Sequence, residues 1–208
     1  MENNKNNSQW HKFNFVVIDI EGTGGQDKEN EEILEIAAFS ITQGKLEKKS
    51  YFHSLINPQR SIRRYPWVYI KNEDVKDAPI FNEIKLDLVN YLGKSILIGH
   101  NVNVDWRLLK RKLPAYEPII LDTLKLSRKL YSGYKKHSLD NLIERFDLKD
   151  TQTNKTPLKR HSALYDAMVT GEIFLKIVNE KFANEVTLGE LIELCGIEVK
   201  EVKQDTLF

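Results

Sequence analysis

Apolar runs in the first part of the chain predict strands. Three of them cover residues 13–20, 31–41 and 49–58, and short polar segments or a Gln-Gly turn separate them. Runs rich in Val, Ile and Phe that are bounded by turn residues are typical of strands joined as hairpins. The pattern therefore predicts a three-stranded antiparallel meander.

The second part of the chain alternates short apolar runs with amphipathic stretches. Residues 95–100 and 119–122 form the short runs, and helical spacing follows each of them. Such alternation predicts parallel strands linked by helices. Together with the meander, the pattern predicts an α/β fold: a mixed five-stranded sheet with helices on both faces. The expected helices cover residues 78–93, 104–111, 123–131, 137–146, 161–178 and 188–195.

One domain accounts for the chain, with no internal repeat. Residues 1–12 are polar and rich in Asn, so we expect a disordered N-terminal tail. The domain itself is expected over residues 13–182, with an aperiodic loop at 149–159. A further helix and a charged linker are expected over 183–203, followed by a short peptide at 204–208.

Composition is ordinary for a soluble globular protein. The chain has 208 residues, of which 41% are hydrophobic and 29% are charged, and its formal net charge is +1. A net charge this close to zero does not by itself indicate a nucleic-acid partner. Cys195 is the single cysteine, which excludes an intramolecular disulfide and disfavours a thiolate zinc site. With no signal-peptide or membrane-spanning stretch, we expect a cytoplasmic protein with no membrane partner.

The first apolar run carries two acids at its end. Asp19 and Glu21 follow Phe15-Val16-Val17-Ile18 and lie two residues apart, on one face of the expected strand. Carboxylates in such surroundings are costly unless their charge is compensated. Carboxylate oxygens suit Mg²⁺ or Mn²⁺. The pair therefore predicts half of a metal site.

Three further residues complete a candidate catalytic set. Asp105 follows the run at 95–100, and His161 and Asp166 begin the long helix. Strand ends and helix starts gather at one edge of an open sheet, so these segments could converge. Two divalent cations held by Asp19, Glu21, Asp105 and Asp166 could hydrolyse a phosphodiester, with His161 as the base. Each acid alone has an ordinary interpretation, as a turn or helix-end residue; their joint occurrence favours the metal site.

The motifs DIEGTG, HNVNVD and HSALYD, in this order, resemble those of the DEDDh 3′–5′ exonucleases. The resemblance covers about residues 13–180, and within the family it is strongest to the epsilon proofreading subunit of bacterial DNA polymerase III. It implies an RNase H-like fold and two divalent cations, Mg²⁺ or Mn²⁺. It makes Asp19, Glu21, Asp105 and Asp166 the metal ligands and His161 the general base.

The resemblance also implies substrate contacts near the terminal nucleotides. These are expected from Ile20, Gly22, Thr23, His100, Asn101, Trp67 and Tyr69. His100 and Asn101 have an alternative role as caps of the next helix, and Trp67 and Tyr69 as core aromatics. Gly22 departs from the family pattern, which has a threonine there, so the loop beside the nucleotide is expected to be looser.

The end of the chain carries a separate signal. Gln204, Leu207 and Phe208 belong to the sequence QDTLF, which exposes two large apolar residues after a charged stretch. The pattern resembles the peptide with which bacterial polymerases and repair proteins bind the sliding clamp. The alternative is a tail that packs back on its own domain.

Taken together, these patterns predict a metal-dependent exonuclease acting on a DNA 3′ end, as a replicative proofreader held at the sliding clamp. A replicative polymerase subunit is a further expected partner. One alternative is an RNA 3′ exonuclease of the RNase T or oligoribonuclease type, because the motifs are shared. Another is a non-catalytic adaptor that binds DNA or a polymerase, which the intact set of acids argues against.

Overall fold

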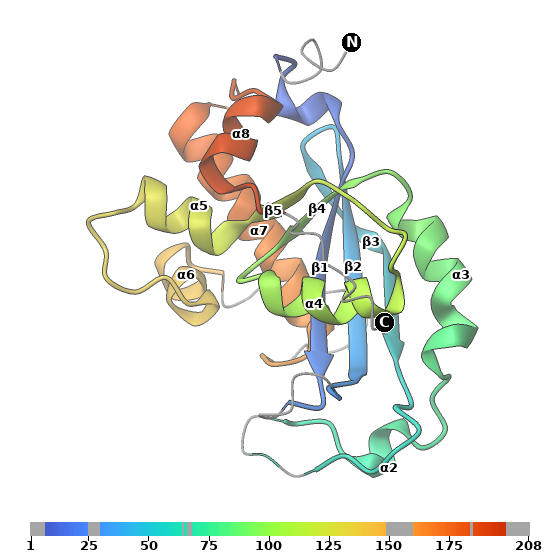
Figure 1. The fold of residues 1–208 in the computed structure, drawn as a ribbon. Coiled ribbons are helices and arrows are strands. Elements are labelled where there is room, and N and C mark those ends of the chain that lie inside the picture. The colour runs from blue at the N-terminus through green and yellow to red at the C-terminus, as the bar shows by residue number, and fades with distance from the viewer. Residues whose placement is uncertain are drawn as a thin grey trace, which may run out of the picture.

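The computed structural model describes residues 7–24, 30–63, 65, 68–148, 160–183 and 185–198. Its centre is one five-stranded sheet in the order β3-β2-β1-β4-β5 (Figure 1). The first three strands pair antiparallel, and β4 and β5 run parallel to β1. The mixed sheet predicted from the apolar pattern is therefore confirmed, with its antiparallel half formed by the early strands.

The elements follow the predicted order closely. They are η1 (Trp10–Lys12), β1 (Phe15–Gly22), β2 (Ile33–Thr42), β3 (Lys45–Leu55), α2 (Asn72–Val75), α3 (Phe81–Leu92), β4 (Ile96–Gly99), α4 (Asn103–Lys112), β5 (Ile120–Asp122), α5 (Thr123–Leu130), α6 (Leu139–Arg145), α7 (Ala163–Phe182) and α8 (Leu188–Cys195). Among these helices, none has the length and apolar character of a membrane span.

Side chains of β1 alternate between two hydrophobic cores, one on each face of the sheet. Phe15 and Val17 join the core that also contains residues of α5, α6, α7 and α8. Val16 and Ile18 join the other core, which contains residues of α3 and α4. In Figure 1, α4 crosses in front of the sheet and α7 runs behind it. Helices thus cover both faces, as predicted.

The expected N-terminal tail is corrected by the structure. Residues 7–12 are described, and Trp10 is only 1% exposed. Its indole packs against Phe15 and Phe174, with ring centroids 5.7 and 5.5 Å away. Its backbone N–H donates to the carbonyl of Val186 at 3.1 Å. One large aromatic side chain therefore anchors a segment whose polar composition suggested disorder; residues 1–6 lie outside the described residues.

The folded unit also continues beyond residue 182. Helix α8 begins with a capping box of Thr187 and Glu190, and buries Leu188 and Leu191 in the core shared with α7. After α8, the Ile197 N–H donates to the carbonyl of Ile120 at 2.9 Å. The described segment through residue 198 thus packs on the same cores as the rest of the domain. Residues 199–208 and the predicted loop at 149–159 lie outside the described residues.

Candidate active site

The end of β1 carries Asp19 and Glu21 on the face covered by α7. Alternation along the strand places them on the same side as Phe15 and Val17. Pairing of β1 with β4 ends at Val17, so this end of β1 continues beyond its parallel neighbour. The two carboxylates therefore lie where the sheet opens toward the start of α7.

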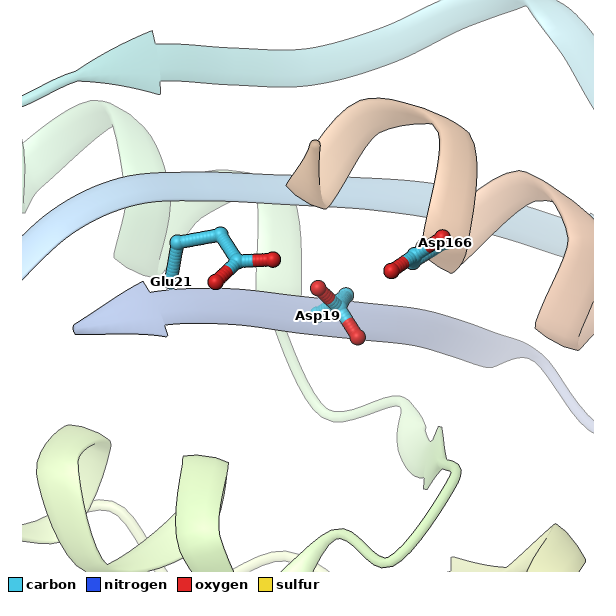
Figure 2. Close-up of side chains that lie close together, drawn as sticks. All are labelled: Asp19, Glu21 and Asp166. Atoms are coloured by element: carbon cyan, nitrogen blue, oxygen red, sulfur yellow. The ribbon is translucent and has the colours of Figure 1, made fainter. Parts of the chain in front are cut away.

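The first turn of α7 supplies Asp166. The side-chain hydroxyl of Ser162 caps this helix by accepting the N–H of Tyr165 at 3.3 Å. Figure 2 shows Asp166 pointing from α7 toward Asp19 and Glu21 on β1. Each of the three acids offers a carboxylate oxygen, and these oxygens lie within 4.8 Å of one another. The structure therefore brings together three of the four predicted ligands.

Asp105 lies beside this cluster but makes a different contact. It is 7% exposed in the first turn of α4, and its Oδ1 accepts the backbone N–H of Ile20 at 2.9 Å. This bond holds the part of β1 between Asp19 and Glu21. The Asp105 carboxyl is close enough to Asp19 to raise the pKa of that residue. The fourth predicted acid is thus at the site, with one oxygen engaged by the backbone.

Burial makes the ionised form of these acids costly. It raises the pKa of Glu21 to about 7, of Asp105 to about 8 and of Asp166 to about 6. It also raises the pKa of Asp19 well above its ordinary value, and the neighbouring carboxylates Asp105, Asp166 and Glu21 raise it further. Such perturbed carboxyl groups are typical of functional sites that need a cation.

A cation that the sequence did not single out faces the cluster. The guanidinium of Arg160 forms ion pairs with Asp166 and with Asp140 of α6. Its charge lowers the pKa values of Asp19, Glu21 and Asp166, against the effect of burial. In the sequence Arg160 is one of several cations in and beside a polar loop, where a solvated role is usual.

His161 precedes α7 instead of forming its first turn. Its backbone is in the left-handed region, with φ of 66°, and its ring stacks on Tyr69 with centroids 4.8 Å apart. Partial burial and the nearby Arg160 lower the pKa of His161. The predicted base therefore lies next to the acidic cluster in the chain, with its ring against an aromatic residue that is 57% exposed.

The pair His100-Asn101 does not cap α4. The N-cap of that helix is Val102, which makes no side-chain cap bond. His100 Nδ1 lies 3.0 Å from the hydroxyl of Thr123, and burial lowers the pKa of His100 to about 4. The Asn101 N–H donates to Asp122, which also caps α5. The capping alternative for the pair is thus wrong, and it is the Asp122 side chain that caps a helix, α5.

Gly22 ends β1 and Thr23 follows it directly, and both have close neighbours. A Cβ on Gly22 would lie 2.8 Å from Glu31 Oε1 and 3.1 Å from Leu108 Cδ1, so neighbouring side chains already fill that space. The Thr23 hydroxyl accepts the N–H of Glu32 at 3.1 Å. The Thr23 hydrogen bond ties the end of β1 to the segment that leads into β2. The space that a side chain at position 22 would need is therefore already occupied, and residues 25–29 of the loop that follows lie outside the described residues.

Some predicted residues fall outside the described part of the chain, and one missed residue falls inside it. Trp67 and the peptide residues Gln204, Leu207 and Phe208 are not described.

Glu35 is a residue near the site that the sequence analysis did not identify. It is 5% exposed in β2, among the apolar residues that surround it in the strand. An acid inside an apolar strand was the available signal, the same signal that identified Asp19.

Known proteins similar to this chain are exonucleases and DNA polymerase III proteins. Residues 16–174 match the family model described as RNase_T: Exonuclease. The chain is 36% identical over 172 residues to a PolC-type DNA polymerase III of Caldanaerobacter subterraneus subsp. tengcongensis, which is 80% of this chain but 12% of that protein. It is 34% identical over 173 residues to the DNA polymerase III subunit epsilon of Aquifex aeolicus, covering 80% of this chain and 81% of that protein.

A solved structure shows the same fold. Exonuclease X in complex with 5′ overhanging duplex DNA is 27% identical, with a TM-score of 0.62. The match covers 83% of this chain and 97% of that one. The mixed sheet with helices on both faces is thus the RNase H-like arrangement of the DEDDh exonucleases.

Proposed function

Because this chain belongs to the DEDDh 3′–5′ exonucleases of the RNase T type, we propose that it removes nucleotides from DNA 3′ ends by metal-dependent phosphodiester hydrolysis. The observation that carries the proposal is the convergence of Asp19, Glu21 and Asp166, whose oxygens lie within 4.8 Å of one another. Two elements far apart in the sequence supply these acids, and Asp105 lies alongside.

The residues present fit divalent cations. All the donors are carboxylate oxygens, which suit Mg²⁺ or Mn²⁺. Asp166 Oδ1 is buried and has no hydrogen-bond partner among the described residues, so it is available to a ligand. Asp19, Glu21, Asp105 and Asp166 would hold the ions. When bound, such ions neutralise charge on the phosphodiester and lower the pKa of a coordinated water.

The other roles concern the proton and the substrate. His161 would take a proton from the attacking water, since its segment directly precedes the turn that carries Asp166. The terminal nucleotides would contact the end of β1 and its loop, the His100-Asn101 turn, and the segment that includes Tyr69. The last of these offers an exposed aromatic ring for base stacking.

A DNA substrate is favoured by the relatives, which include an epsilon subunit and PolC-type polymerases. We expect the purified protein with Mg²⁺ or Mn²⁺ to degrade 3′-recessed and single-stranded DNA at least about tenfold faster than RNA of matched sequence. Oligomers labelled at the 5′ end would show shortening from the 3′ end. Faster degradation of RNA would instead identify an RNA 3′ exonuclease.

Replicative proofreading at the sliding clamp is the finer proposal. The similarity to an epsilon subunit supports it, and so does the peptide QDTLF. Leu207 and Phe208 would occupy an apolar groove of the clamp, and Gln204 would contact its rim. Such tethering, together with a replicative polymerase subunit, would raise the local concentration of the enzyme at the primer end.

Deletion of residues 204–208 tests the tether. We expect the dissociation constant for the sliding clamp of the same organism, measured by surface plasmon resonance, to rise at least about tenfold. Exonuclease activity on short oligomers should not change. Thr206→Ala, which changes a spacer position in the peptide, is the matched control and should bind normally. Unchanged clamp binding by the deletion variant would show that this peptide is not the anchor.

A further inference from the structure

Glu35 is a buried acid at the centre of the sheet. It is 5% exposed in β2 and lies directly opposite Glu21 of β1 in the antiparallel register. It therefore projects from the same face of the sheet as Asp19 and Glu21, next to the acidic cluster. A further carboxylate here adds like charge beside Glu21, a cost that requires a compensating role.

Both oxygens of Glu35 are engaged by the protein itself. Oε1 lies 2.8 Å from Nε2 of His53, which is on the neighbouring strand β3. Oε2 accepts the backbone N–H of Ala163 at 3.1 Å, a buried contact between residues 128 positions apart in the sequence. Since each oxygen already has a partner, Glu35 is not arranged as another metal ligand.

The Ala163 N–H belongs to the first residue of α7. N–H groups of a first helical turn have no partner within the helix. Oε2 of Glu35 supplies the missing acceptor for the Ala163 N–H. It joins β2 to the same helical turn that presents Asp166 to the cluster.

We propose that Glu35 is a positioning residue, which holds the first turn of α7 against the sheet and so sets the place of Asp166 relative to Asp19 and Glu21. His53 orients the Glu35 carboxylate from its other side. The catalytic consequence rests on the proposed exonuclease function, whereas the structural contact can be tested without it.

Two conservative variants separate position from charge. Glu35→Gln keeps the length of the side chain and an oxygen for the Ala163 N–H, but removes the charge. Glu35→Asp keeps the charge, but is one methylene too short for the same contact. The positioning role predicts that Glu35→Gln resembles the unchanged protein and that Glu35→Asp is impaired.

The first measurement is hydrogen exchange of the Ala163 amide by NMR in protein treated with EDTA. Glu35→Asp should speed this exchange about tenfold or more, the size expected for losing a hydrogen bond to a charged group. Glu35→Gln should leave it within about threefold. Glu190→Ala is the matched control, because Glu190 accepts the N–H of Thr187 at the start of α8. It should leave Ala163 exchange unchanged.

The second measurement is calorimetric titration with Mn²⁺, followed by steady-state kinetics. Glu35→Asp should weaken Mn²⁺ binding about tenfold and lower kcat with little change in KM, a loss of the size seen for partners that orient ligands. Glu35→Gln should keep the Mn²⁺ affinity and the kcat of the unchanged protein. If Glu35→Gln is the impaired variant, the charge matters and the positioning role is wrong. Normal exchange of the Ala163 amide and normal Mn²⁺ binding in both variants would also overturn the positioning role. If the exchange pattern is as expected but the unchanged protein has no nuclease activity, only the proposed function is rejected.

Discussion

Asp19→Asn is expected to reduce 3′-end hydrolysis at least about 10³-fold, because it removes a charged ligand from the centre of the acidic cluster. Asp19 is the acid that each of the other three influences: Asp105, Asp166 and Glu21 all raise its pKa. Asparagine has the same shape, so the substitution leaves the packing at the end of β1 intact. The rate of release of the terminal nucleotide from labelled DNA, measured with Mg²⁺ in excess, gives the result.

The same substitution is expected not to destabilise the metal-free protein. Burial and like charges make the ionised Asp19 costly in the folded state. Removing that charge should therefore maintain or increase the melting temperature in EDTA, even as activity is lost. Asp87→Asn, at an exposed position on α3, is the matched control and should change neither property. If Asp19→Asn keeps more than a tenth of the activity, the proposed metal site is wrong and the non-catalytic adaptor becomes the better interpretation.

Trp10→Ala is expected to lower the free energy of unfolding by about 3–5 kcal/mol, the usual cost of truncating a buried Trp. The indole is 1% exposed and contacts Phe15 of β1 and Phe174 of α7. Truncation would leave a cavity between the first strand and the longest helix. Because a domain is stabilised by only about 5–15 kcal/mol, this loss is a large fraction of the total.

Urea unfolding followed by circular dichroism would measure that change. Lys12→Ala, in the same short segment but exposed, is the control and should cost less than about 0.5 kcal/mol. A cost below about 1 kcal/mol for Trp10→Ala would mean that the segment is loosely attached, as its composition suggested. The proposed catalytic residues lie elsewhere, so activity at low temperature should persist in the variant.

The sheet and the acidic residues were predictable because their signals are local in the sequence. Alternating or continuous apolar runs specify strands, and an acid at the end of such a run is conspicuous. The Ser138 cap of α6 and the capping box of α8 are likewise set by short local patterns. Convergence of Asp19 and Asp166 followed from strand ends and helix starts meeting at one edge.

The missed features depend on tertiary contacts. Trp10 is surrounded by polar residues in the sequence, and only its contacts with Phe174 and Val186 show that it belongs to the core. Arg160 follows a polar loop in the sequence, and its pairing with Asp140 and Asp166 requires that α6 and α7 be placed together. The stacking of His161 on Tyr69 similarly joins two irregular segments that no periodic pattern links.

The order in which the site is assembled has a consequence for protein synthesis. Asp19, Glu21 and Asp105 are made early, whereas Asp166 and the Ala163 N–H that binds Glu35 come about sixty residues after Asp105. At a usual rate of translation these residues take roughly 3–12 s to add. During that interval the nascent chain can already contain most of the sheet but lacks the helix that completes the cluster. With the proposed metal site, we therefore expect a ribosome-bound chain to gain nuclease activity only after α7 has emerged and docked.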